Sequence, residues 1–137
     1  MSYASIYNLE TRDDAFDGKE THVLTLIDAS TTVPDMSEGP TAISIIEIPI
    51  TATTSLANWV RDNSISNFYL SPDKVFSSTS VGGAEALAYR YSGLYEVDAV
   101  AVAHNGKIYL FAVSWMNASD RIRSDFKNLL SSVTFIP

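Results

Sequence analysis

The segment VAVAHNGKIYLFAVSW, residues 100–115, constrains the fold more than any other part of the chain. Apolar residues run almost without a break on both sides of Asn105–Gly106, a pair that favours the type I′ turn of a two-residue hairpin loop. The segment therefore predicts two antiparallel strands, Val97–His104 and Lys107–Trp115. An antiparallel sheet commonly leaves one face in water, so apolar residues on both faces predict a sheet that is covered on both sides.

The two faces of this predicted hairpin differ in bulk. A two-residue loop places the larger pairs on one face, namely Val102 with Tyr109, Val100 with Phe111, and Asp98 with Val113. The other face carries many small residues, namely Ala103 with Ile108, Ala101 with Leu110, and Ala99 with Ala112. We expect a helix to pack closely on the alanine-rich face, whereas the aromatic face fills a thicker layer.

Other segments carry strand and turn patterns. β-Branched or alternating residues predict strands over residues 21–27, 41–50, 74–80 and 86–91, and SSVTFIP predicts a short closing strand. Gly82–Gly83 predicts a turn or bulge between two of these strands. Residues 29–40 are rich in Ser, Thr, Pro, Asp and Gly, a composition typical of a surface loop.

Two segments carry the spacing of helices. Leu56, Trp59 and Val60 follow the i, i+3, i+4 pattern after a Thr or Ser that can cap a short helix. A second, more clearly amphipathic helix begins at Asn117 or Ser119 and carries its apolar residues at i, i+4, i+7 and i+8. These elements predict an α+β fold, a three-layer α/β/α sandwich around a mainly antiparallel sheet of about six strands.

The 137 residues contain no repeat or long linker, which predicts a single domain over residues 1–137. The chain has no cysteine, so disulfides, thiolate metal sites and cysteine nucleophiles are excluded. No apolar run reaches the roughly 20 residues of a membrane-spanning helix, and the first ten residues lack the pattern of a signal peptide. We therefore expect no membrane insertion. The location would be extracytoplasmic if an anchor precedes Met1 and cytoplasmic otherwise.

The net charge of −7 is concentrated in the first third of the chain. Residues 1–50 hold nine acidic residues against Arg12 and Lys19, whereas the remainder is balanced. Such a chain repels nucleic acids and anionic lipid surfaces and favours a basic partner or a cation. The densest acidic stretch predicts a partner-binding surface at Asp13, Asp14, Asp17 and Glu20.

The spacing of acidic and histidine residues does not match the known metal-binding motifs, and known catalytic motifs are not found in the sequence. With Asp13 as the first residue of a calcium loop, Ala15 and Leu24 occupy the third and twelfth positions, where oxygen ligands belong. His22 and His104 lack a third ligand at the spacing of a zinc site. The sequence has no nucleophile elbow, P-loop or dinucleotide fingerprint. We therefore predict no catalytic residue, metal or cofactor.

The order of elements and several short motifs resemble the PsbP-like superfamily. The motifs are YNLE at Tyr7–Glu10, SLANW at Ser55–Trp59, VGGAEA at Val81–Ala86, NGKIYL at Asn105–Leu110, and FKNLLSSVTF at Phe126–Phe135. The resemblance implies an antiparallel sheet between helices. It also implies relatives that act as non-catalytic partners: an extrinsic subunit of photosystem II, a Ran-binding nuclear-import factor and tethered bacterial domains. It implies no shared active-site residues.

Two classes of function remain open from the sequence. The first is a non-enzymatic protein-interaction or accessory domain that uses the acidic stretch. The alternative is a small-ligand carrier or enzyme with a cavity between the sheet and its helix, lined by Arg90, Asp98 and His104. A pocket into which Asp98, Arg90 or His104 converges would favour the alternative, and a solid core would count against it.

Overall fold

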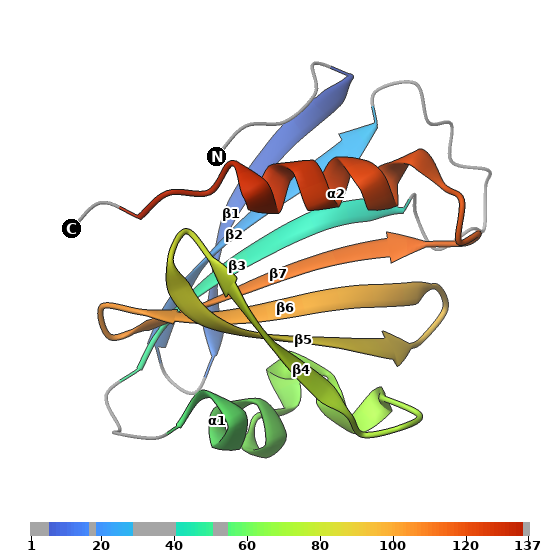
Figure 1. Cartoon of the computed structure of the whole chain (residues 1–137). Helices are drawn as coiled ribbons and strands as arrows, with labels where there is room; N and C mark the ends of the chain where they lie inside the picture. Colours follow the sequence, from blue (N-terminus) through green and yellow to red (C-terminus); the bar gives the residue numbers. More distant parts are fainter. Residues whose placement is uncertain (1–5, 17–18, 29–40, 51–54, 136–137) are drawn as a thin grey trace.

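The computed structural model describes residues 6–16, 19–28, 41–50 and 55–135 (Figure 1). Seven strands form one antiparallel sheet in the order β1-β2-β3-β7-β6-β5-β4. The strands are β1 (Tyr7–Phe16), β2 (Lys19–Asp28), β3 (Ala42–Pro49), β4 (Phe76–Val81), β5 (Ala84–Ser92), β6 (Glu96–His104) and β7 (Lys107–Trp115). The helices are α1 (Leu56–Asp62) and α2 (Arg121–Ser131), with 3-10 turns η1 (Ser64–Ser66) and η2 (Phe68–Leu70). The α+β class is therefore correct, with seven strands instead of about six.

The central hairpin has the predicted register. His104 pairs with Lys107, and each further pair follows along β6 and β7. Asn105 and Gly106 adopt φ of 49° and 73°, as the type I′ turn requires. A second two-residue turn at Gly82–Gly83 joins β4 to β5, also with positive φ at both positions.

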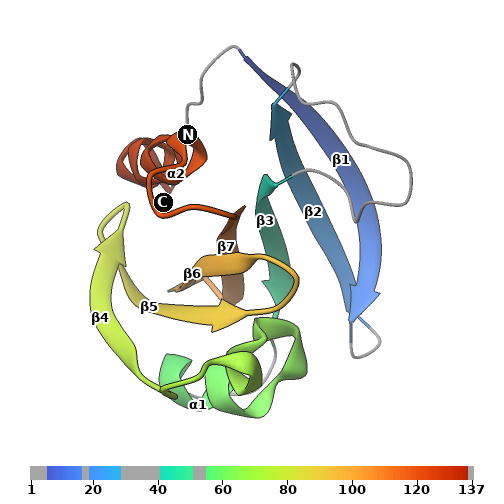
Figure 2. The same ribbon diagram turned by 90° about the vertical axis from the view of Figure 1, so that its right-hand side faces the viewer.

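The two faces of the sheet carry separate clusters of buried side chains. On the bulky face, Val100, Phe111 and Val113 pack in one cluster with Phe126 and Leu129 of α2. The alanine-rich face is covered by α1 and the 3-10 turns, whose buried residues include Leu56, Trp59, Val60 and Phe68. Figure 2 shows α2 and α1 on opposite sides of the curved sheet.

The strand patterns in the sequence did not predict β1, and they predicted a closing strand that the structure does not contain over residues 132–135. The strand β1 extends as far as Phe16, through an acidic stretch whose polarity is typical of a turn, because an exposed edge strand need not bury either face. Residues 132–135 belong to no strand, so the predicted closing strand is wrong over the described part of SSVTFIP. Val133 is nevertheless buried against the bulky face, and Phe135 packs at its margin.

The start of α2 is also displaced from the predicted cap at Asn117 or Ser119. Asp120 is the N-cap residue, and its Oδ2 accepts hydrogen bonds from the backbone N–H groups of Met116 and Asn117, both at 3.0 Å. The helix α1 does begin as expected, because Ser55 accepts a hydrogen bond from the Asn58 backbone. Among the described residues, neither helix is long and apolar enough to cross a membrane. The predicted loop at residues 29–40 lies outside the described residues.

Candidate functional site

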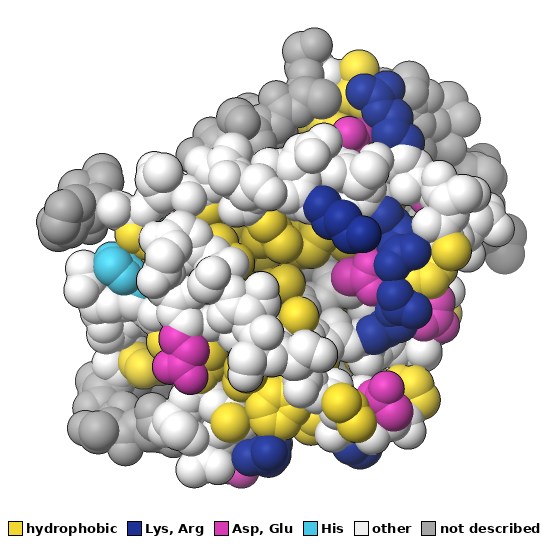
Figure 3. Space-filling view, in the orientation of Figure 1, with side chains coloured by type: hydrophobic (Ala, Val, Ile, Leu, Met, Phe, Trp, Pro, Cys, Tyr) yellow, Lys and Arg dark blue, Asp and Glu magenta, His cyan; other side chains and the backbone are white. Residues whose placement is uncertain are grey.

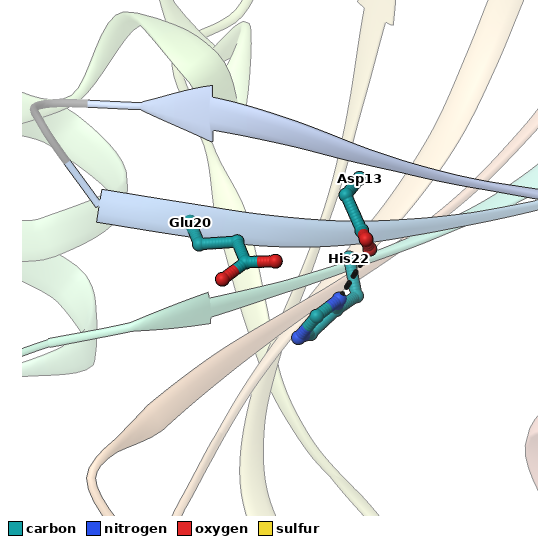
Figure 4. Close-up of side chains that lie close together, drawn as sticks. All are labelled: Asp13, Glu20 and His22. Carbon is teal, nitrogen blue, oxygen red and sulfur yellow. Dashed lines mark hydrogen bonds and ion pairs between the residues drawn. The ribbon is translucent and has the colours of Figure 1, made fainter.

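The hairpin of β1 and β2 brings together three polar side chains that are separated in sequence. Asp13 lies directly opposite His22, and Glu20 precedes His22 by two residues on the same face of β2. The Oδ1 atom of Asp13 is 2.7 Å from Nδ1 of His22 (Figure 4). One ligand-type atom from each of the three residues lies within 4.8 Å of the others.

The contact with Asp13 also changes the protonation of the imidazole. The hydrogen bond to the Asp13 carboxylate, aided by the charges of Glu20 and Glu47, raises the pKa of His22 above its ordinary value. Both partners remain open to water, since the side chains of His22 and Asp13 are 50% and 67% exposed. The pair is therefore a surface feature that attracts protons and other cations, and salt screens it strongly.

A fourth residue continues this polar line onto the next strand. Glu47 of β3 pairs with His22 of β2, and its Oε1 accepts a hydrogen bond from Nζ of Lys107 at 2.8 Å. This contact raises the pKa of Lys107. We call Asp13, Glu20, His22 and Glu47 the acidic row. Lys107 pairs with Glu47 and His22 pairs with Asp13, so Glu20 is the member of the row that takes part in no ion pair among the described residues.

Asp13, Glu20 and His22 of the acidic row are the side chains of the described residues that lie close enough together to share a metal ion. Carboxylate and imidazole are suitable donors for a divalent cation. Spacing along the chain did not predict this grouping, because cross-strand pairing supplies it. The signal that could have found it is the turn-forming dipeptide Asp17–Gly18 in the sequence, because a two-residue connection there aligns Asp13 with His22, as the observed pairing does.

An apolar pocket lies next to the acidic row on the same face of the sheet. Its volume is about 490 Å³, and Leu24 and Ile45, which follow the row along β2 and β3, are among its walls. The aromatic rings of Tyr109, Phe111 and Phe135 also line the pocket. We call this the aromatic pocket.

The aromatic pocket contains one of the sequence candidates, His104. Its ring stacks on Phe135 with the centroids 4.4 Å apart. Within the described residues, Nε2 of His104 is buried and has no hydrogen-bond partner. An unpaired buried nitrogen is costly, so a ligand or water that bonds to it would be stabilised.

The other two candidates of the predicted pocket lie elsewhere. Arg90 and Asp98 face each other across β5 and β6, with Nε 2.9 Å from Oδ1, and both line a groove beside α2. His104 stands at the opposite end of β6, about 20 Å along an extended strand. The three predicted pocket residues therefore do not converge.

Arg123 also contacts Asp98, in addition to the ion pair between Arg90 and Asp98. Its Nε is 2.9 Å from Oδ2 of Asp98. The guanidinium groups of Arg123 and Arg90 lie 4.3 and 5.1 Å from the ring centroid of Trp115. Sequence reasoning missed Arg123, because the sequence did not show which face of the sheet the helix α2 covers; the structure places it on the bulky face, which carries Asp98.

The four predicted partner-binding acids are only partly grouped. Asp13 and Glu20 share one face of the hairpin. Asp14 points to the opposite face, because successive side chains of a strand alternate between the two faces. Its Oδ2 atom lies 4.0 Å from Nε of Arg12. Asp17 lies outside the described residues.

The chain matches no protein-family model, no curated protein and no solved structure. The resemblance to the PsbP-like superfamily therefore rests on the sequence motifs and their order.

Proposed function

We propose that the protein is a non-catalytic interaction domain that binds a basic protein partner through the acidic hairpin of β1 and β2. The observation that carries the proposal is the clustering of Asp13, Glu20 and His22 on one exposed face of this hairpin. Two exposed carboxylates gathered on one patch, Asp13 and Glu20, attract an oppositely charged partner and orient it. In keeping with the resemblance, we propose the three-layer sandwich of the PsbP-like superfamily as the scaffold.

The exposure of the acidic row supports a binding role over catalysis. General acids and bases usually work in clefts, where burial and fixed neighbours shift their pKa values strongly. Asp13, Glu20 and His22 all lie at the surface. The edge of β1 adds a second surface to which a partner can bind, because β1 ends the sheet and pairs only with β2 among the described strands.

Charge reversal of the acidic row tests this proposal. The double variant Asp13→Lys and Glu20→Lys is compared with Asp62→Lys and Glu85→Lys, a matched pair of exposed acids on α1 and β5. Each protein is used to capture partners from native extract at low and moderate salt. We expect a basic partner that the wild type and the matched control retain and the row variant loses.

The decisive outcome is the behaviour of that partner. Retention by the row variant at both salt concentrations would remove the hairpin from the interface. Equal loss from both double variants would show that net charge, not the acidic row, governs binding.

We propose small-molecule binding in the aromatic pocket as a second candidate function. The supporting observation is the buried Nε2 of His104, which has no hydrogen-bond partner in the described part of the chain and lies beside a largely apolar hollow of about 490 Å³. Such a pocket suits an aromatic or aliphatic body that carries one polar group. In an NMR fragment screen, we expect binders to shift the signals of the His104 ring. A screen whose binders all shift other regions would exclude this candidate.

A further inference from the structure

Two adjoining hollows form one groove between α2 and the strand β4. The first has a volume of about 450 Å³ and the second about 600 Å³. They are continuous, since both are lined by Ala88, Val100, Lys127 and Leu130. Figure 3 shows hydrophobic side chains exposed in the hollow below α2, with Lys and Arg side chains gathered toward one end. We call this hollow the β4–α2 groove.

One wall of the groove is the free edge of the sheet. The strand β4 ends the strand order, and within the described part of the chain it has a ladder only with β5. Backbone N–H and C=O groups along such an edge are available to another strand. The segment FSSTSV lacks the Lys, Pro or bulge that commonly blocks an edge, and four of its six residues are exposed.

The opposite wall and the floor supply side-chain pockets. Phe126 and Leu130 of α2 line the groove together with Ala88 and Val100 of the sheet, and room remains between the helix and these two residues. The edge from Ser77 to Gly82 borders the groove, a length that matches about six extended residues, or about 20 Å. Strand edge, helix wall and apolar floor are the parts that bind an extended peptide by strand addition.

The charge of the groove differs from that of the whole chain. In a protein of net charge −7, the first hollow is lined by three cations and two carboxylates, namely Arg90, Arg123, Lys127, Asp73 and Asp98. Asp98 is shared by Arg90 and Arg123. Lys127 belongs to both hollows and takes part in no ion pair among the described residues. The site is therefore complementary to an acidic side chain.

We propose that the β4–α2 groove binds an extended peptide segment of a partner protein. The peptide pairs with the free edge of β4, places alternate apolar side chains over Ala88 and Val100, and presents an Asp or Glu to Lys127. Main-chain hydrogen bonds provide affinity, and the pocket and the lysine provide sequence preference. This surface is separate from the acidic row and does not depend on the function proposed for it.

The test begins with a phage-displayed library of random eight-residue peptides, selected against the immobilised full chain. Enriched peptides are synthesised, and their affinities are measured by calorimetry and their contact sites by amide NMR. We expect apolar residues at alternate positions with an Asp or Glu between them. Binding should shift the amides of β4 and α2, and not those of β1 and β2.

Two changes separate strand addition from nonspecific adhesion. Lys127→Glu should lower the affinity for the selected peptides by about tenfold, because an attractive charge pair becomes repulsive. Arg12→Glu, an equivalent charge reversal on the distant strand β1, should leave the affinity within about twofold. N-methylation of the peptide should abolish binding at alternate positions, where its N–H points to β4, and be tolerated at the others.

Several results would overturn the proposal. These are an exhausted library without binders, amide shifts confined to the acidic row or the aromatic pocket, or uniform tolerance of N-methylation. The variant Asp13→Lys with Glu20→Lys should bind the selected peptides as the wild type does. Its behaviour keeps failure here distinct from failure of the acidic-row proposal.

Discussion

Substitution of the two glycines in the β4–β5 turn should have unequal effects. Gly82 and Gly83 both adopt positive φ, 58° and 80°, so alanine is strained at either position by about 1–2 kcal/mol. A Cβ atom at Gly83 meets nothing within 4 Å. At Gly82 it would lie 2.9 Å from Cδ2 of Phe135 and 3.0 Å from the backbone oxygen of Val133.

The extra contact at Gly82 adds a second cost. Inserting a methyl group into packed surroundings costs about 1–3 kcal/mol, and the Val133 oxygen is backbone that cannot rotate away. We therefore expect Gly83→Ala to lower the free energy of unfolding by about 1–2 kcal/mol and Gly82→Ala by about 2–5 kcal/mol. The difference between the two variants measures how closely the segment after α2 packs on the turn.

Urea unfolding followed by the fluorescence of Trp59 and Trp115 provides the measurement. In a Phe135→Ala background, the cost of Gly82→Ala should fall toward that of Gly83→Ala, because two of the three close contacts belong to the Phe135 ring. Equal losses for the two glycine variants in the wild-type background would refute the packing of residues 133–135 against this turn.

Three further perturbations have defined outcomes. Asp13→Asn should lower the pKa of His22 in an NMR titration, and an unchanged pKa would contradict the contact. The bonded pair stabilises the fold at pH values below 6.5, the ordinary pKa of histidine, and this contribution disappears as the pH rises through the raised pKa. Asp120 has a lowered pKa because the N–H groups of Asn117 and Met116 donate to it; Asp120→Ala should destabilise the fold above pH 3.8, with the difference from wild type fading in urea curves as pH falls through the lowered pKa. Leu129→Ala removes a fully buried side chain beneath α2 and should cost about 2–5 kcal/mol in urea unfolding, and a loss below about 1 kcal/mol would contradict that packing.

The local parts of the fold could be predicted from the sequence. The register of β6 and β7 follows from one two-residue turn, because a turn of fixed length aligns every pair that follows it. The apolar spacing of Leu56, Trp59 and Val60 likewise places the buried face of α1 correctly. Hydrophobic periodicity and turn-forming residues depend on residues that are close together in the chain, so both can be identified from the sequence.

The contents of the candidate sites could be predicted only in part. Asp13 and Glu20 were identified by their charge, whereas their grouping with His22 depends on the pairing of β1 with β2. Arg90, Asp98 and His104 were predicted to share a pocket, yet the length of β6 separates the histidine from the other two. Arg123 joins Asp98 only because α2 crosses the bulky face at that point.

The sequence by itself determined the strands of the central hairpin, their two apolar faces and the helices that cover them, because hydrophobic period and the Asn105–Gly106 turn act locally. Tertiary structure alone decided that β1 forms the edge beside β2, that the segment after α2 packs on Gly82, and that α2 and β4 enclose a groove. These features join residues far apart in the chain, and their distances depend on the curvature of the sheet and the placement of a helix across it, which no short-range pattern encodes.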